Sequence, residues 1–229
     1  MNIKHKKPTL TKKQRHKLRV QQVRRQKIFL TCLFLLIVGC ILLRFSKFSG
    51  RQKETHQINA ACEAYRDEVS SEAAQYDMSD YVDLILAVMM QESSGQGTDP
   101  MQSSEGAYNT RYPQQPNGIT DPSYSISCGI QELKYALEKA VCTGPTDLSK
   151  IRLALQAYNF GADSYFAYLE ENGQTVWTAQ SAQAFAQMAS GGTQRDEDDP
   201  LHDPAGPWDY GDQYYPDHVL RYYHLDNNS

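Results

Sequence analysis

The chain has 229 residues, 40% of them hydrophobic, and a formal net charge of −4. This small net charge conceals an uneven distribution of charge along the chain. All 27 acidic residues lie beyond Gly50 with only 10 of the 23 basic ones, which gives residues 51–229 a charge of −17. Such an acidic segment is a poor candidate for binding nucleic acid by counterion release. The five cysteines and six scattered histidines show no zinc-site spacing, so we expect no metal and no cofactor.

The amino-terminal segment predicts attachment to the cell membrane. Residues 1–27 carry eleven Lys and Arg and no acid, and residues 28–43 are an uninterrupted run of apolar residues, Thr, Gly and Cys. Sixteen residues are fewer than the ~20 that span a bilayer core, but flanking Phe residues extend the run and flanking basic side chains can reach the interfaces. We predict a basic cytoplasmic arm (1–27), a single-pass signal anchor (28–45) and a linker (46–57), with the rest of the chain extracellular.

A lipid anchor is the alternative to this signal anchor. The sequence Ile-Val-Gly-Cys at 37–40 resembles the cleavage signal of bacterial lipoproteins, in which Cys40 would become the lipidated first residue. The apolar run continues through residues 41–43 beyond that cysteine. This continuation favours an uncleaved anchor.

Residues 58–226 have the size of one domain, and their patterns predict an all-α fold. Apolar residues recur at helical spacing in seven segments, residues 58–76, 81–92, 126–141, 148–158, 163–172, 178–189 and 216–223. We expect Ser79 to cap the second helix, Ser123 or Ser125 the third, and Asp147 the fourth. Gly- and Pro-rich residues 98–125 and acidic, Pro-rich residues 194–210 are predicted loops.

The cysteines of this domain do not form a disulfide framework. Cys62, Cys128 and Cys142 are odd in number, so at least one has no partner within the domain. Cys128 and Cys142 lie near opposite ends of one predicted helix, too far apart for a disulfide bond. A bridge from Cys62 to one of them stays open.

Glu92 is the first candidate for a functional residue. Tyr81, Leu84, Ile85, Val88 and Met89 form the apolar stripe of the second predicted helix. The same spacing then places Glu92 on that stripe, immediately before a Ser-Ser-Gly segment that ends the helix. Burial raises the pKa of a carboxyl group. A general acid needs such a raised pKa near neutral pH, whereas the structural alternative is a Glu that turns to solvent.

Four short motifs follow one another on the predicted helices and loops. They are Met-Gln-Glu-Ser-Ser-Gly at 90–95, Asp-Pro-Met-Gln-Ser-Ser-Glu at 99–105, Ile-Thr-Asp-Pro at 119–122 with Ser125, Ile126 and Gly129, and Ala-Leu-Gln-Ala-Tyr-Asn-Phe-Gly at 154–161. This order resembles the lysozyme-like domain of Gram-positive wall hydrolases from conjugative elements and of the pneumococcal vaccine antigen A type. That domain is a relative of goose-type lysozymes and Slt-type lytic transglycosylases. Residues 210–223 resemble its end.

The resemblance implies a lysozyme-like catalytic domain over residues 58–226. It implies that the substrate is a peptidoglycan glycan strand, cut at the β-1,4 bond between N-acetylmuramic acid and N-acetylglucosamine, with Glu92 as general acid. It also implies that Gln102, Tyr158 and Asn159 bind sugar groups; the structural alternatives are a core position for Tyr158 and a helix cap for Asn159. Many relatives carry a peptidase domain after the muramidase, and we expect none here because the chain ends soon afterwards.

The sequence leaves the outcome of the reaction open. A second carboxylate that activates water would make the enzyme a muramidase, and the candidates are Asp99, Glu105 and Asp121 in the predicted loop. Without one, attack by the muramic acid 6-hydroxyl would give anhydro ends, which is lytic transglycosylation. A non-catalytic wall-binding or secretion scaffold is the alternative from another class. A membrane-anchored hydrolase would suit a conjugation or secretion machine as its partner.

Overall fold

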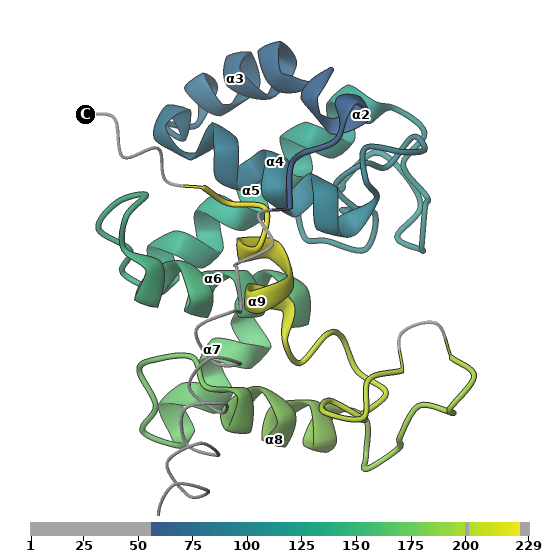
Figure 1. The fold of residues 1–229 in the computed structure, drawn as a ribbon, viewed down its shortest axis with the longest axis vertical. Coiled ribbons are helices and arrows are strands. Elements are labelled where there is room, and N and C mark those ends of the chain that lie inside the picture. Colours follow the sequence, from purple (N-terminus) through teal and green to yellow (C-terminus); the bar gives the residue numbers. More distant parts are fainter. Residues whose placement is uncertain (1–55, 200–201, 225–229) are drawn as a thin grey trace, which may run out of the picture. The chain divides into compact units, whose positions relative to one another are not determined.

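Helices make up almost all regular structure in the computed structural model, which describes residues 56–199 and 202–224 (Figure 1). The helices are α2 (Ala60–Glu63), α3 (Arg66–Gln75), the 3-10 turn η1 (Ser79–Tyr81), α4 (Val82–Glu92), α5 (Pro122–Lys139), α6 (Leu148–Phe160), α7 (Ala162–Glu171), α8 (Ala179–Ala189) and α9 (Tyr215–Leu220). Extended pairing in this part of the chain consists of one isolated bridge between Gln194 and Trp208. The predicted all-α fold is therefore confirmed for the described residues.

The predicted membrane anchor, residues 28–45, lies outside the described residues, as do the basic arm and most of the linker. Among the helices that are described, none combines the length and apolar character needed to cross a membrane.

Helix α4 lies at the centre of the fold. Its residues 84–89 are all fully buried, so the helix is enclosed on every side and the predicted amphipathic stripe is too narrow a description. α2 and α3 pack against α4, and α9 packs on both α4 and α6 (Figure 1). α5 contacts α3 and α6, while α7 packs on α6 and α8 lies beyond it. Tyr215 of α9 thereby reaches Glu92, although the two are 123 residues apart in sequence.

Two predictions for the amino-terminal helices are wrong, one for a helix interior and one for a helix cap. The expected helix over residues 58–76 is broken into α2 and α3, because the Tyr65 N–H bonds to the Cys62 carbonyl three residues back and tightens the chain there. Ser79 does not cap α4. It begins the turn η1, and α4 follows Tyr81 without a side-chain cap. Apolar spacing continues through both breaks, so it could not reveal them.

Helix α5 begins earlier than predicted. Its cap is Asp121, whose carboxylate accepts from the backbone N–H groups of Ser123 and Tyr124, and neither Ser123 nor Ser125 has that role. Pro122 follows at the first helical position, where its fixed φ suits a helix and its missing N–H costs nothing. The loop after α4 therefore ends at Asp121 and not at residue 125.

The predicted cap of α6 is confirmed, since the Asp147 side chain accepts from the Lys150 N–H. Gly161 ends α6 with a positive φ of 84°. Thr178, which the pattern predicted as the first residue of a helix, instead caps α8 in a capping box with Ser181. Three cysteines of the described residues are all free, with Cys62 and Cys128 buried and Cys142 just beyond the end of α5. The bridge from Cys62 that the sequence left open does not form.

Candidate active site

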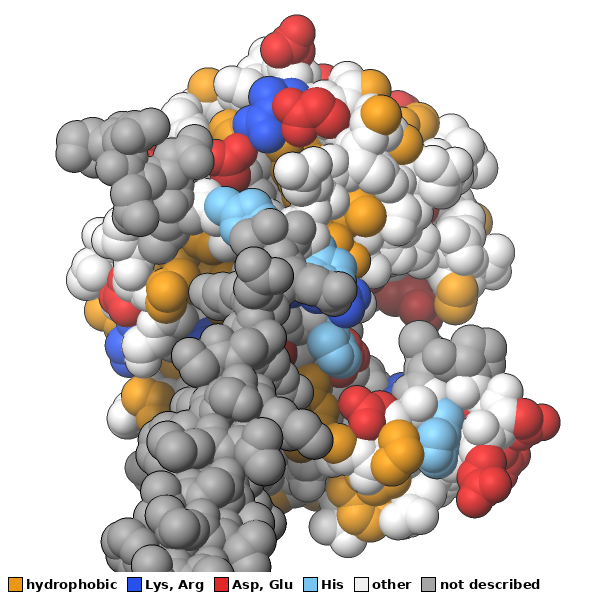
Figure 2. All heavy atoms as spheres, viewed as in Figure 1, with side chains coloured by type: hydrophobic (Ala, Val, Ile, Leu, Met, Phe, Trp, Pro, Cys, Tyr) orange, Lys and Arg blue, Asp and Glu red, His pale blue; other side chains and the backbone are white. Residues whose placement is uncertain are grey.

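A cleft of about 1240 Å³ opens beside the C-terminal end of α4. It is lined by the end of α4, the loop that follows, parts of α5 and α6, and the segment that leads into α9. Figure 2 shows the hollow, with acidic side chains at its edge. Within the described residues, no group of three or more His, Cys, Asp or Glu side chains is arranged to hold a metal ion.

Glu92 is the last residue of α4 and enters the cleft where the backbone turns away. Ser94 and Gly95 both have positive φ values, 55° and 72°, so the helix cannot continue. A Cβ atom on Gly95 would lie 2.7 Å from the Cys62 backbone nitrogen, so only glycine lets α2 approach this turn. The Ser93 hydroxyl donates to the Pro100 carbonyl at 2.8 Å and ties the turn to the next loop. The end of α4 is thus held from two sides.

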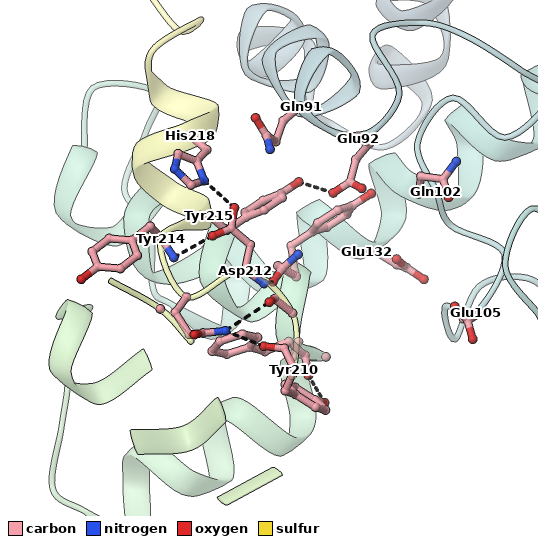
Figure 3. Close-up of a pocket in the computed structure, with 18 of the residues that line it drawn as sticks. Gln91, Glu92, Gln102, Glu105, Glu132, Tyr210, Asp212, Tyr214, Tyr215 and His218 are labelled. Atoms are coloured by element: carbon pink, nitrogen blue, oxygen red, sulfur yellow. Dashed lines mark hydrogen bonds and ion pairs between the residues drawn. The ribbon is translucent and has the colours of Figure 1, made fainter. Parts of the chain in front are cut away.

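The Glu92 side chain is half-buried and faces α9 (Figure 3). Burial raises the pKa of Glu92 to about 7, and the negative charges of Asp212 and Asp99 act in the same direction. The Tyr215 hydroxyl donates a hydrogen bond to Glu92 Oε1, which opposes that rise. Near neutral pH this carboxyl group can therefore hold a proton and also release it.

Asp99, a predicted second carboxylate, is a buried centre of the loop and does not line the cleft. Its Oδ1 accepts from the Ser103 N–H at 3.0 Å and the Ser125 hydroxyl at 2.6 Å, and its Oδ2 accepts from the N–H and hydroxyl of Ser104. The Ser104 hydroxyl in turn accepts from the Ile119 N–H. These bonds join both ends of the loop to α5.

The other predicted loop residues divide between the cleft and the helix cap. Gln102 and Glu105 are exposed and line the cleft, on the side opposite α9 (Figure 3). Gln102 has a positive φ of 50°, and its Nε2 donates to the Asp99 carbonyl and to Asn117. Asp121 caps α5 and does not line the cleft.

Tyr158 and Asn159 both line the cleft and also hold its parts together. The Tyr158 hydroxyl donates to the Met101 carbonyl at 2.9 Å, and its ring stacks on the Tyr215 ring with centroids 6.3 Å apart. Asn159 Oδ1 accepts from the Asp212 N–H at 2.7 Å. Both residues were predicted to lie in the cleft, and both do, but the sequence did not indicate these contacts.

Comparisons with known proteins agree with this architecture. A family model described as lysozyme-like matches residues 60–223. The chain belongs to the lysozyme-like family. The bifunctional muramidase/DL-endopeptidase CwlT of Bacillus subtilis is 35% identical over 169 residues, which cover 74% of this chain and 44% of CwlT. A pneumococcal vaccine antigen A homolog of Streptococcus pyogenes is 37% identical over 110 residues, which cover 48% of this chain and 50% of that protein.

A solved structure has the same fold. It is described as similar to a lipoprotein of the NLP/P60 family from Staphylococcus aureus, and it matches with a TM-score of 0.62 and 27% identity over 76% of this chain and 56% of that one. This chain therefore spans about half the length of the relatives that it matches.

The cleft of this lysozyme-like domain holds a carboxyl group that sequence reasoning missed. Glu132 on α5 lines the cleft, and its Oε1 is enclosed without a hydrogen-bond partner among the described residues. A Cβ atom on Gly106 would lie 1.4 Å from that oxygen, so a side chain at residue 106 would displace the Glu132 carboxyl group from its present position. Burial raises the pKa of Glu132 to about 7, and the charges of Asp99 and Glu92 add to this. A signal existed, since Glu132 lies three residues after buried Gly129 on the apolar face of its helix.

A second missed group joins α6 to α9 in the lysozyme-like domain. The His218 Nδ1 and Asp212 Oδ2 atoms are 2.5 Å apart, and this contact raises the pKa of His218. Gln156 is fully buried; it donates to the Asp212 carbonyl and accepts from Trp177. The partners of Gln156 lie 56 and 21 residues away in sequence, His218 and Asp212 lie six residues apart, and no local pattern indicated these contacts.

Proposed function

We propose that this domain is a peptidoglycan hydrolase that cleaves the β-1,4 bond between N-acetylmuramic acid and N-acetylglucosamine, with Glu92 as the general acid. The observation that carries the proposal is a half-buried carboxyl group, with its pKa raised to about 7, at the wall of a large cleft. Membership of the lysozyme-like family and the similarity to a muramidase/endopeptidase support the reaction class.

Glu92 would act through the oxygen that faces the substrate. Oε1 accepts the hydroxyl hydrogen of Tyr215, so the transferable proton belongs on Oε2. That proton would pass to the glycosidic oxygen while the sugar develops oxocarbenium character, which leaves Glu92 ionised. The Tyr215 hydrogen bond then stabilises the carboxylate that has formed.

Two carboxyl groups stand as candidates for activating water. Glu132 and Glu105 line the cleft, whereas the hydrogen bonds of Asp99 and Asp121 commit those two side chains to the loop and the helix cap. Glu132 is the better candidate, because its half-buried carboxyl group lines the cleft close enough to Glu92 for their charges to interact, whereas Glu105 is exposed. A water-activating carboxylate favours a muramidase over a lytic transglycosylase.

The remaining lining groups suit a sugar chain. Gln102 exposes an amide at the loop wall, and Tyr158 presents an aromatic ring beside Glu92. Asn159 has its Oδ1 occupied by the Asp212 N–H, so its amino group is the part left for a substrate. We propose that these three groups contact N-acetyl or hydroxyl groups of the glycan strand.

The test is wall digestion by Glu92→Gln, with Glu105→Gln and Glu132→Gln made in parallel. The amide keeps the acceptor for Tyr215 but carries no transferable proton, so we expect a loss of ~10²–10⁴-fold in rate. Weighing the products separates the outcomes, because reducing ends and anhydro ends differ by one water. A folded Glu92→Gln protein that digests wall at the parent rate contradicts the acid assignment, and a parent without turnover favours the scaffold.

We also propose that residues 28–45 anchor the domain at the outer face of the cell membrane. The eleven positive charges before the apolar run support this orientation, and one relative, 40% identical over 115 residues, is named an uncharacterized membrane protein. Protease added to intact protoplasts should digest the domain, whereas full protection contradicts the orientation. Fatty-acid labelling that depends on Cys40 would replace the signal anchor by a lipid anchor. A tethered hydrolase of this kind suits a conjugation or secretion machine.

A further inference from the structure

Arg221 stands out among the cationic side chains of this acidic domain. Of the eight described Lys and Arg side chains, five form ion pairs with carboxylates, and the three without one are Arg111, Lys150 and Arg221. Only Arg221 of these three lines the cleft. Arg195, the other arginine of the cleft, uses its guanidinium on the carbonyls of Trp208 and Gly211 and on Asp209.

The Arg221 guanidinium is held in place but keeps most of its donors. Its Nη2 donates to Gln91 Oε1 at 3.0 Å, and the group lies 4.9 Å from the Tyr222 ring centroid. Gln91 immediately precedes Glu92, so the cation lies beside the acid-bearing end of α4. The residue is exposed, which leaves its other N–H groups open to a ligand.

His218 lies beside Arg221 and pairs with the nearby carboxylate of Asp212. It lies one turn before Arg221, and its Nδ1 contacts Asp212 Oδ2. The other carboxylate oxygen of Asp212 accepts from the Tyr214 N–H at 2.8 Å. Asp212 is therefore occupied by these two groups, and it does not neutralise Arg221.

We propose that Arg221, with His218 beside it, is the subsite for a carboxylate on the lactyl arm of muramic acid. The proposal rests on the function proposed above and names the feature of the glycan that the cleft selects. A planar guanidinium matches a carboxylate in a paired, charge-assisted contact. Of the two sugars in the strand, only N-acetylmuramic acid carries such an arm. Contact with it would fix which sugar lies on each side of Glu92.

The test measures binding without turnover, in the Glu92→Gln protein. Three ligands are compared: strands that keep their peptides, denuded strands with a free lactyl carboxylate, and N-acetylglucosamine oligomers without an arm. Arg221→Gln should weaken binding of an arm-bearing strand about tenfold, which is the value of one charge-assisted hydrogen bond, and leave the oligomers unchanged. Arg221→Lys should restore part of the loss. Arg111→Gln is the matched control, because it removes the same charge outside the cleft.

The ligands separate the two sources of the carboxylate. A loss for denuded strands assigns the lactyl carboxylate, and a loss confined to peptide-bearing strands assigns the peptide. Unchanged binding by Arg221→Gln, an equal loss for the oligomers, or the same loss in Arg111→Gln overturns the subsite. Because no step needs hydrolysis, a protein that lacks turnover but binds through Arg221 contradicts the enzyme and not the subsite.

Discussion

The two walls of the cleft are built by different kinds of contact. The wall that follows α4 includes bonds between near neighbours, in which Asp99 accepts from Ser103 and Ser104, four and five residues away, and it is also tied to α5 and α6 by Ser125 and Tyr158. The wall that leads into α9 is held by distant partners, since Gln156 and Asp212 are 56 residues apart and Tyr215 and Glu92 are 123 apart. The first wall positions Glu92, and the second wall supplies the Tyr215 hydrogen bond that opposes the effect of burial on the pKa of Glu92.

The Asp99 network should show the largest effect if the first wall is broken. Asp99→Asn replaces a carboxylate oxygen by an amino group that faces hydrogen-bond donors, so the buried cluster loses acceptors. We expect the free energy of unfolding to fall by about 3 kcal/mol, measured by urea denaturation. Glu105→Gln in the same loop is exposed and should stay within about 0.5 kcal/mol of the parent. An Asp99→Asn protein of parental stability would show that the wall is held by other contacts.

The burial of Glu92 should appear as a stability difference that depends on pH. The folded state holds the proton more tightly than the unfolded chain, so the charged form opposes folding as pH rises from about 4.5 through 7. Glu92→Gln carries no charge and should be more stable than the parent by about 1–2 kcal/mol at pH 8. At pH 4 the two should unfold at the same temperature. A variant that is less stable than the parent at pH 8 contradicts the raised pKa.

Tyr215→Phe tests whether the second wall sets the acid. The phenylalanine keeps the ring beside Tyr158 but removes the hydroxyl that donates to Glu92. That hydrogen bond lowers the pKa of Glu92, so its loss should move the alkaline limb of the pH–activity profile upward by about half to one pH unit, or ~1 kcal/mol. An unmoved limb would mean that burial alone sets the pKa.

The first wall could be predicted from the sequence for a physical reason. Helical spacing carries Glu92 onto a buried face, and the Ser-Ser-Gly turn that follows needs positive φ values that end a helix. Asp147 was also placed correctly, because a cap acts within three or four residues of itself.

The second wall could not be predicted in the same way. Residues 210–215 were recognised only as the end of a family domain, and nothing near Asp212 in sequence names His218, Asn159 or Gln156 as its partners. Glu132 was not predicted as a site residue, for a different reason. Its spacing placed it on a buried face, but its position beneath Gly106 depends on how a loop folds over the helix.

Substitutions of Asp121 test whether this carboxylate is structural or catalytic, and they should have the smallest effect on stability. The sequence offered it as a second carboxylate, but its Oδ1 accepts from the N–H groups of Ser123 and Tyr124 at 3.2 and 3.5 Å. These bonds are long, so Asp121→Ala should cost about 0.5–1 kcal/mol of unfolding free energy. Asp121→Asn keeps a capping oxygen and should cost less, because asparagine caps helices about as well as aspartate. Both variants should digest wall at the parent rate, since the side chain does not line the cleft. A folded Asp121→Asn protein without activity would show that Asp121 takes part in catalysis as well as capping α5.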